Sequence, residues 1–382
     1  MTDSFRWHPE ARLVDASGRG VSPQTPTGPV VPDGAAGLAQ VIGLAAFRIG
    51  AVDQPGAVMG KAPLFETLTA GSTGTPRRIV RTQASWTASF AVNAGFGIGL
   101  GARIAVLGRL VHSLALYGAV EGLNLGAEVH LLDLLRPDRQ RTALVDRRIT
   151  HLYATPAQLR LLGSGTCPDL RLVLVGGSKL DPTLRKAMRA MAPGATIREF
   201  YGAAETSFIT LADDDTPEGS VGRPYPGVEI SVEVGKIWVK SPYLFLGYAG
   251  VSGGAQWRDG WLSVGEIGRM EGGFLYLRGR AGRMVTVADQ NVFPEEIEAV
   301  LAGMPGITQA AVLPVPERKR GAVLVAFVQG DRAVEARVKA ELRAELGPLK
   351  TPKAMIWLDD WPILPTGKTD LKALEARVKW PV

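Results

Sequence analysis

The chain has 382 residues, of which 46% are hydrophobic and 21% charged; this balance excludes a disordered chain and leaves room for two or three domains. The formal net charge is +6, but basic residues alternate with acids along the chain, so the sequence does not favour a nucleic-acid-binding protein. Cys167 is the only cysteine, so no internal disulfide can form and we expect a reducing compartment.

The first residues of the chain do not resemble an export signal. The segment MTDSFRWHPE at 1–10 is polar and lacks a basic stretch followed by an apolar one. The most apolar window, residues 38–50, is too short to cross a bilayer and contains Arg48. We therefore expect a cytoplasmic protein with no membrane span.

The first two thirds of the chain alternate between strand and helix patterns. Residues 15–35 are rich in Gly, Pro, Ser and Thr and are expected to be irregular, and a helix is expected near 38–48. Short apolar runs predict buried strands at 103–108, 127–132, 150–155 and 170–177. The segments between them predict helices at 114–125, 156–163 and 181–191. This alternation predicts a parallel sheet with helices on its faces.

The pattern changes after about residue 220. The segment GVEISVEVGKIWVKSP at 227–242 alternates with period two, as antiparallel strands do, and similar strands continue to about 279. A helix starting at Pro294, strands at 309–315 and 322–330, and a helix at 333–346 follow. We predict an α/β fold with a large domain of mixed sheets and flanking helices over 1–279, the linker GRAGR at 279–283, and a small mobile α+β lid domain over 280–382.

The stretch TAGSTGTPRR at 69–78 is the first candidate for chemistry. Successive backbone N–H groups and hydroxyls in such a loop can surround phosphate oxygens, and Arg77 and Arg78 can add forked donors. Its spacing does not match a Walker A loop. Taken alone, the stretch fits a phosphate-binding loop between two strands and a basic surface turn equally well.

Four further segments complete an ordered set. They are FYGAAETS at 200–207, DGWLSVGEIGRMEGGFLYLRGRAGR at 259–283, QNVFPEEIE at 290–298 and LPTGKTDLKAL at 364–374. With the first stretch, they resemble the adenylate-forming superfamily, which comprises acyl-CoA synthetases, nonribosomal peptide adenylation domains and firefly luciferases. The resemblance covers roughly residues 60–376, and segments such as HSLALYGAVEGLNLGAEVHLL at 112–132 are similar to the acyl-CoA synthetase branch.

The resemblance implies a nucleotide site. The β- and γ-phosphates of ATP would be held by Thr69, Gly71, Ser72, Thr73, Gly74, Thr75 and Arg77. Adenine would lie between Tyr201, with the adjoining Gly202, and the turn Gly176–Gly177–Ser178. Glu266 and Arg280 would contact the ribose hydroxyls.

The resemblance also implies catalytic groups. Glu205 would be the carboxylate beside Mg²⁺, and Thr206 would adjoin the α-phosphate. Lys368 would enter the site for adenylation when the small domain swings at the linker, with Gly282 as the hinge. Lys368, Glu205, Thr206 and Arg280 are therefore the predicted catalytic set.

The acyl pocket is expected to contain His112, Ala203 and Ala204. Small residues leave room in such a pocket, so a medium-chain fatty or aryl acid fits better than acetate. The implied cofactors are ATP, Mg²⁺ and coenzyme A.

We therefore predict an ATP-dependent acid–thiol ligase that forms an acyl-adenylate, releases pyrophosphate and transfers the acyl group to coenzyme A. One alternative is an adenylating enzyme that passes the acyl group to a carrier protein or an amine. Another is a non-catalytic descendant that binds a nucleotide, although the joint presence of Glu205, Arg280 and Lys368 argues against it. The sequence does not identify the acid.

Three departures from the family pattern stand out. About 68 residues precede the phosphate loop, so we expect a reduced N-terminal part over 1–60 and a homodimer that covers the exposed apolar surface. Glu266 stands where relatives usually have aspartate, which shifts the carboxylate by about 1.5 Å. Ala288 and Asp289 replace a pair of glycines, which favours an acceptor other than coenzyme A.

Overall fold

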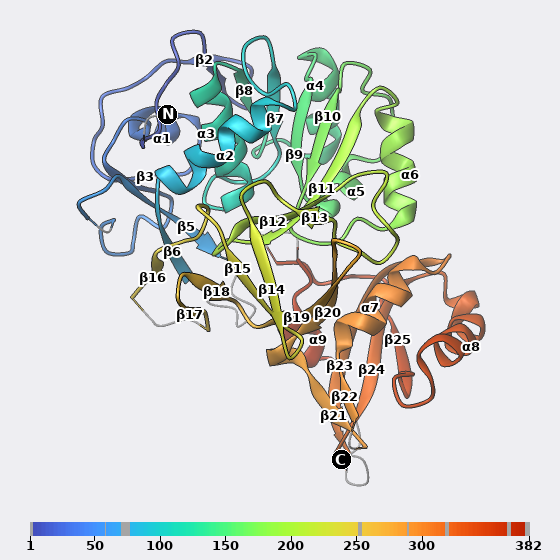
Figure 1. The fold of residues 1–382 in the computed structure, drawn as a ribbon. Helices are drawn as coiled ribbons and strands as arrows, with labels where there is room; N and C mark the ends of the chain where they lie inside the picture. Colours follow the sequence, from blue (N-terminus) through green and yellow to red (C-terminus); the bar gives the residue numbers. More distant parts are fainter. Residues whose placement is uncertain are drawn as a thin grey trace.

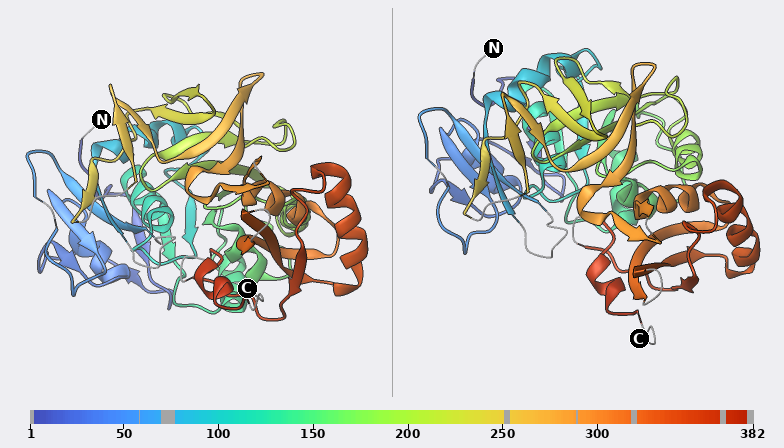
Figure 2. Two further views of the ribbon diagram at one scale, coloured as in Figure 1. Left: turned by 90° about the horizontal axis from the view of Figure 1, so that it is seen from below. Right: turned by 60° about the horizontal axis from the view of Figure 1, so that its bottom comes forward.

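The structure is a computed structural model that describes residues 3–57, 59–69, 77–250, 254–288, 290–317, 321–364 and 368–378. Figure 1 shows a larger part formed by the first three quarters of the chain and a smaller C-terminal part beside it. The two views of Figure 2 show the same arrangement from other directions. No helix among the described ranges is long and apolar enough to cross a membrane.

A nine-stranded sheet is the frame of the larger part, with the order β13-β12-β11-β10-β9-β7-β8-β1-β2. The neighbours from β1 to β11 in this order run parallel, and β2, β12 and β13 are antiparallel additions at the edges. The strands are β1 (Arg12–Val14), β2 (Gly20–Val21), β7 (Arg103–Val106), β8 (Glu128–Leu131), β9 (His151–Ala154), β10 (Leu172–Val175), β11 (Thr196–Ala203), β12 (Ser207–Ala212) and β13 (Arg223–Pro224). The predicted parallel sheet is therefore confirmed.

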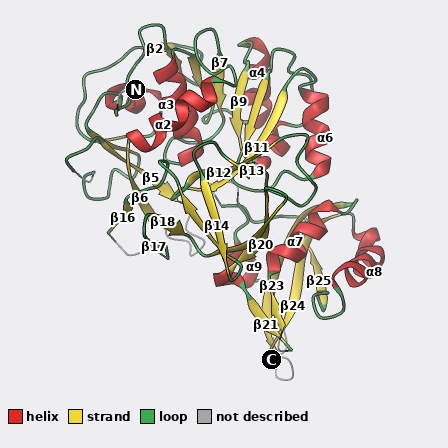
Figure 3. Ribbon diagram, viewed as in Figure 1, coloured by secondary structure: helices red, strands yellow, loops and turns green. Residues whose placement is uncertain are grey.

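Helices cover both faces of this sheet, as Figure 3 shows. They are α2 (Ala84–Ala94), α3 (Ser113–Leu125), α4 (Pro137–Asp146), α5 (Pro156–Leu162) and α6 (Pro182–Met191). One apolar core joins α2 and α3 to one face, and a second core joins α4, α5 and α6 to the other. The sequence pattern missed α4, because PDRQRTALVD is mostly polar and buries only one narrow stripe.

The single helix predicted near 38–48 is wrong. The structure has α1 (Ala35–Val41), then Gly43 at φ +99°, then β4 (Ala46–Ile49). A left-handed residue between them ends the helix, and glycine adopts that conformation readily. Arg48 on β4 is fully buried and pairs with Glu66 at 2.9 Å, so the second half of this apolar window is an internal strand.

Two further sheets complete the larger part. A mixed five-stranded sheet has the order β16-β6-β5-β4-β3, with β3 (Val30–Val31), β5 (Leu64–Thr69), β6 (Arg77–Thr82) and β16 (Gly247–Ala249). An antiparallel six-stranded sheet follows in the chain, with β14 (Glu229–Glu233), β15 (Lys236–Lys240), β17 (Gln256–Arg258), β18 (Trp261–Ser263), β19 (Glu266–Glu271) and β20 (Phe274–Arg280). The antiparallel pattern expected after residue 220 is confirmed.

The C-terminal part has its own sheets and cores. Its elements are β21 (Val285–Val287), β22 (Gln290–Val292), α7 (Pro294–Gly303), β23 (Ile307–Glu317), β24 (Gly321–Gly330), α8 (Glu335–Leu346), β25 (Ala354–Trp357) and α9 (Leu371–Glu375). Short 3₁₀ turns lie at Ala281–Arg283 and Arg332–Val334. These elements match the predicted α+β composition, and the boundary at 279–280 stays a prediction.

Candidate active site

The two strands that flank the candidate phosphate loop form a regular antiparallel pair. Thr69 on β5 lies opposite Arg77 on β6, and the Arg77 amide donates a hydrogen bond to Thr69 Oγ1 at 3.4 Å. The residues between them, including Gly71, Ser72, Thr73, Gly74 and Thr75, lie outside the described residues. The two strands expected on either side of the loop are thus present.

A second strand pair carries Glu205. Strands β11 and β12 run antiparallel and are joined by a tight turn at Ala204–Thr206. At Gly202 a Cβ would lie 1.8 Å from the carbonyl oxygen of Ser207, so only glycine permits this approach. The Thr206 side chain is buried and accepts a hydrogen bond from the Ala203 amide at 3.0 Å. The turn is therefore stabilised by its own residues, through the close backbone approach at Gly202 and the hydrogen bond to the Thr206 side chain.

The Glu205 carboxylate accepts a hydrogen bond from a residue on strand β16. The Tyr248 hydroxyl on β16 donates a hydrogen bond to Glu205 Oε1 at 2.8 Å, and the Arg77 guanidinium lies 5.7 Å from the centre of the Tyr248 ring. Burial raises the pKa of Tyr248, and the Glu205 charge adds to this effect. Strand β16 pairs with β6. Glu205 is therefore linked, through Tyr248, to the strand that follows the candidate phosphate loop.

The predicted adenine contacts lie at neighbouring strand ends. The turn Gly176–Gly177–Ser178 follows β10, and Tyr201 lies on the adjacent strand β11. A Cβ on Gly176 would lie 2.1 Å from the Phe200 ring, and Gly177 adopts φ +98°. The Tyr201 hydroxyl is buried and has no hydrogen-bond partner among the described residues. An unpaired buried hydroxyl at this position fits a site that receives a polar ligand.

Glu266 and Arg280 lie opposite each other on the paired strands β19 and β20. Arg280 Nε is 3.6 Å from Glu266 Oε1; Glu266 is buried, whereas the Arg280 side chain is about half exposed. Burial raises the pKa of Glu266, and the charge of Arg280 opposes that rise. Since Arg280 ends β20, this pair borders the C-terminal part.

Lys368 lies near the residues that the sequence groups with it. The Leu364 amide donates to the Lys368 carbonyl at 2.8 Å, and Ile363 bridges to Thr369, so the described ends of this segment form a closed turn. Lys368 keeps surface exposure, but neighbouring atoms crowd its ammonium group and lower its pKa. Arg280 lowers that pKa further, and Glu205 and Glu266 raise it, so Lys368 lies within electrostatic reach of all three.

His112 is the residue before α3, and its backbone pairs with Leu68 on β5. Burial lowers the pKa of His112, which keeps the ring neutral at pH 7, and the charge of Lys368 adds to the lowering. Its Nδ1 atom is buried without a hydrogen-bond partner among the described residues. Ala203 and Ala204 are half-buried and directly precede Glu205 in the chain.

The donor set fits a magnesium ion that arrives with a nucleotide. No group of three or more His, Cys, Asp or Glu side chains within the described ranges could hold a metal ion by itself. Mg²⁺ commonly takes one or two protein carboxylates together with phosphate oxygens and waters. Glu205, with one oxygen bonded to Tyr248, can supply such a carboxylate.

Sequence reasoning missed two residues of the site. Tyr248 lies in a short strand with no chemical pattern of its own. Arg81 is fully buried and directs its guanidinium at the backbone around Glu205. The signal for Arg81 was its spacing from Arg77 on one strand, because residues two and four apart share a face.

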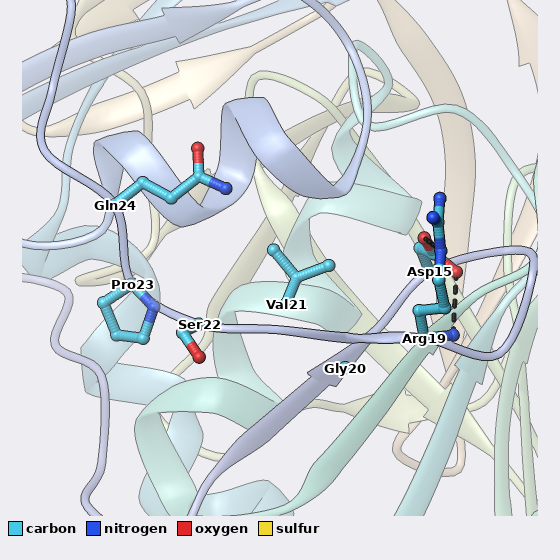
Figure 4. Close-up of a pocket in the computed structure, with 7 residues that line it drawn as sticks. All are labelled: Asp15, Arg19, Gly20, Val21, Ser22, Pro23 and Gln24. Carbon is cyan, nitrogen blue, oxygen red and sulfur yellow. Dashed lines mark hydrogen bonds and ion pairs between the residues drawn. The ribbon is translucent and has the colours of Figure 1, made fainter.

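A shallow depression elsewhere on the molecule has no comparable chemistry. It is lined by Asp15, Arg19, Gly20, Val21, Ser22, Pro23 and Gln24 (Figure 4). The Arg19 and Asp15 side chains form an exposed ion pair at 3.5 Å, which contributes little to binding or stability. It lies at β2, at the edge of the nine-stranded sheet away from β11 and β12.

The fold and the grouped residues define a nucleotide-binding enzyme with a large N-terminal part and a small C-terminal part. Residues 10–249 match the AMP-binding enzyme family, and residues 296–368 match the AMP-binding enzyme C-terminal domain. The chain belongs to the AMP-binding enzyme family.

Three relatives illustrate the similarity. An uncharacterized acyl-CoA ligase from Bacillus subtilis, YhfT, is 34% identical over 324 residues, which cover 80% of this chain and 67% of that protein. The structure of ATP-bound MatB from Rhodopseudomonas palustris superposes with a TM-score of 0.72 at 25% identity, covering 86% of this chain and 71% of that one. The amide bond synthetase McbA from Marinactinospora thermotolerans gives 0.68 at 26% identity, covering 82% and 69%.

Proposed function

We propose that this protein is an acyl-CoA synthetase that activates a carboxylic acid with ATP and transfers the acyl group to coenzyme A. The observation that carries the proposal is the grouping of Lys368 with Glu205 and with the paired residues Glu266 and Arg280, from three separate segments of the chain. Membership of the AMP-binding enzyme family supports it, as does the similarity to an acyl-CoA ligase over 80% of the chain.

In the first half-reaction, an oxygen of the acid attacks the α-phosphorus of ATP, and the bond from that phosphorus to the bridging oxygen of pyrophosphate breaks. Two anions approach each other, so positive charge is needed where negative charge accumulates. Lys368 would stabilise the α-phosphate and the attacking carboxylate, and Arg77 would bind the departing phosphates. A bound Mg²⁺ ion would neutralise phosphate charge beside Glu205.

In the second half-reaction, the thiolate of coenzyme A attacks the acyl carbon and AMP leaves. We propose that the C-terminal part moves between the two steps at residues 279–283, with Gly282 as the hinge. A Cβ at Gly282 would meet no neighbouring atom within 4 Å, so the surroundings of this residue leave room for rotation. His112, neutral at pH 7, would lie beside the acyl group without competing for the carboxylate charge.

One observation favours a second candidate, transfer to an amine or a carrier protein. Ala288 adopts φ +44°, in the left-handed region that favours glycine, and Asp289 lies outside the described residues. A methyl group therefore stands where a glycine would leave the turn open. The similarity to an amide bond synthetase supports the same alternative.

Acid-dependent exchange of labelled pyrophosphate into ATP tests the proposed first step. A panel of acetate, medium-chain fatty acids and aryl acids is compared with a sample lacking acid, and we expect exchange with a medium-chain or aryl acid. Binding of ATP without exchange for any acid would instead support a non-catalytic descendant.

Addition of coenzyme A to the active mixture tests the second step. We expect AMP and acyl-CoA in equal amounts. Exchange that proceeds normally while coenzyme A yields no thioester would favour the amine or carrier alternative. Sedimentation of the same preparation tests the proposed homodimer, and fractionation of producing cells tests the proposed cytoplasmic location.

A further inference from the structure

Arg81 is a fully buried arginine in the middle of the candidate site, and the proposed mechanism does not use it. Its guanidinium donates four hydrogen bonds, all to neutral acceptors, and lies 5.9 Å from the centre of the Trp86 ring. It donates to the carbonyl of Ala204 at 2.5 Å, to Ser207 Oγ at 2.7 Å, to Ser85 Oγ at 3.3 Å and to the carbonyl of Tyr243. No carboxylate of the described residues forms an ion pair with it, so the positive charge is buried without a direct counter-ion.

Three of these contacts converge on the segments that hold Glu205. Ala204 and Ser207 lie on either side of Glu205 and Thr206 in the turn between β11 and β12. Tyr243 begins the segment that leads to Tyr248, whose hydroxyl bonds to Glu205. Arg81 therefore ties together the backbone on both sides of the Tyr248–Glu205 hydrogen bond.

The strand register explains how Arg81 reaches these groups. Tyr248 on β16 lies opposite Ile79 on β6, so the two side chains share a face of the sheet. Arg77 and Arg81 flank Ile79 at two residues on either side and lie on that same face. One face of β6 thus presents a cation at the end of the phosphate loop and a second, buried cation behind Glu205.

Burial of the Arg81 charge is unfavourable in free energy when no anion lies nearby. Burial lowers the pKa of Arg81 to about 9, and the charge that most strongly opposes this effect is that of Glu205. Burying a charge that lacks a partner is unfavourable by several kcal/mol. A bound Mg²⁺–ATP complex would bring additional phosphate charge to the same region.

We propose that Arg81 is a positioning residue for nucleotide activation: it holds the Ala204–Ser207 turn against the Tyr243–Tyr248 segment, so that Glu205 and Thr206 meet the Mg²⁺–ATP complex in a fixed geometry. The catalytic part of this inference rests on the proposed function. The effect of Arg81 on Mg²⁺–ATP binding does not depend on that function and is measured separately.

The test compares Arg81→Met, Arg81→Lys and the control Ser85→Ala. Met keeps much of the volume but removes every donor, and Lys keeps the charge but cannot form the same fork of hydrogen bonds. Ser85→Ala removes the one Arg81 contact outside the Ala204–Ser207 turn and Tyr243. Each variant is assayed for thermal unfolding, Mg²⁺–ATP binding by calorimetry, pyrophosphate exchange and thioester formation from supplied acyl-adenylate.

For Arg81→Met we expect ~100-fold slower exchange and a ~10-fold higher Mg²⁺ concentration for half-maximal ATP binding, because two hydrogen bonds to the turn are lost. Thioester formation from supplied acyl-adenylate should stay within about three-fold of the wild-type rate, because that step does not require the Mg²⁺ geometry. Arg81→Lys should fall between Met and the wild type, and Ser85→Ala should match the wild type.

Two outcomes would overturn the proposal. One is an unchanged Mg²⁺ requirement for ATP binding in Arg81→Met and Arg81→Lys. The other is a parallel loss of thermal stability, exchange and thioester formation in both variants, which would show a purely structural role. A wild-type protein that binds Mg²⁺–ATP but catalyses no exchange would defeat the proposed function alone, since the binding comparison would still decide the role of Arg81.

Discussion

The hydroxyl of Tyr248 donates a 2.8 Å hydrogen bond to Glu205 Oε1, and this contact joins the turn between β11 and β12 to strand β16, through two residues that are 43 positions apart in sequence. A carboxylate that accepts a bond on one oxygen has the other oxygen free to turn toward a cation. The hydrogen bond therefore restrains the orientation of the Glu205 carboxylate.

Removing this hydroxyl should weaken activation without unfolding the protein. For Tyr248→Phe we expect a loss of about 1–2 kcal/mol of transition-state stabilisation, or ~10-fold in the rate of pyrophosphate exchange, since a hydrogen bond to a charged group is lost. Tyr276→Phe is the matched control, because its ring packs against Arg269 at 4.5 Å, outside the proposed contacts. Equal activity of Tyr248→Phe and the wild type would show that the bond does not orient Glu205.

Lys368 should serve one half-reaction only. Lys368→Ala is expected to lower adenylate formation by at least ~100-fold, because the charge near the α-phosphate is removed, and to spare thioester formation from supplied acyl-adenylate. Lys372→Ala, four residues further on in α9, controls for a general loss of positive charge from this segment. If Lys368→Ala slows both half-reactions equally, the assigned role is wrong.

The environment of Lys368 also predicts a pH dependence. Crowding and the charge of Arg280 lower its pKa below the ordinary value of 10.5, so the lysine loses its proton at a lower pH than a free lysine. Adenylation needs the charged form, and its rate should therefore decline on the alkaline side below pH 10.5. The pH profile of exchange measures this decline.

Lys368→Arg is the control for that profile, because an arginine at this exposed position keeps its charge across the range. Its residual exchange activity should lack the alkaline decline. If the decline persists unchanged in Lys368→Arg, it belongs to a group other than Lys368.

The buried carboxyl group of Glu121 leads us to expect that the free energy of unfolding depends on pH. It is fully buried on α3 and accepts hydrogen bonds from Asn93, Tyr117 and Tyr153, and burial raises its pKa to about 7. A raised folded-state pKa means that the folded protein binds the proton more tightly than the unfolded chain. This stabilisation is complete below the unfolded value of 4.5 and is lost as the pH rises through about 7.

We therefore expect the free energy of unfolding of the wild type to fall by about 3 kcal/mol between pH 4.5 and pH 8 through this group alone. Glu121→Gln keeps the shape and hydrogen-bonding capacity but does not titrate, so its stability should be flatter over the same range. Urea unfolding at several pH values measures the difference. Identical slopes for the two proteins would show that Glu121 does not titrate in this range.

Much of the fold followed from local patterns. Strands β7, β8, β9 and β10 are four-residue runs that each contain two to four apolar residues, and α5 and α6 begin with a capping residue followed by proline. Such signals are local, so one sequence suffices to predict them. The helix expected near 38–48 was wrong because the same apolar residues suit a buried strand, and the conformation of Gly43 decides between them.

The site was predictable where a motif carries the chemistry and not where packing creates it. Glu266 and Arg280 were predicted to act together as the ribose contacts, and they lie opposite each other in register on paired strands. Arg81 and Tyr248 obtain their roles from a strand pairing between residues about 170 positions apart. No local pattern encodes that pairing, because register depends on the whole sheet.

The spacing of Arg77 and Arg81 on strand β6 limits which insertions and deletions the protein can tolerate. Arg77 and Arg81 face the same side because they are separated by an even number of positions. Deleting or inserting one residue between them would turn one of the two arginines to the opposite face of the sheet, even if every side chain were kept. The spacing within β6 is therefore fixed by the geometry of an extended chain.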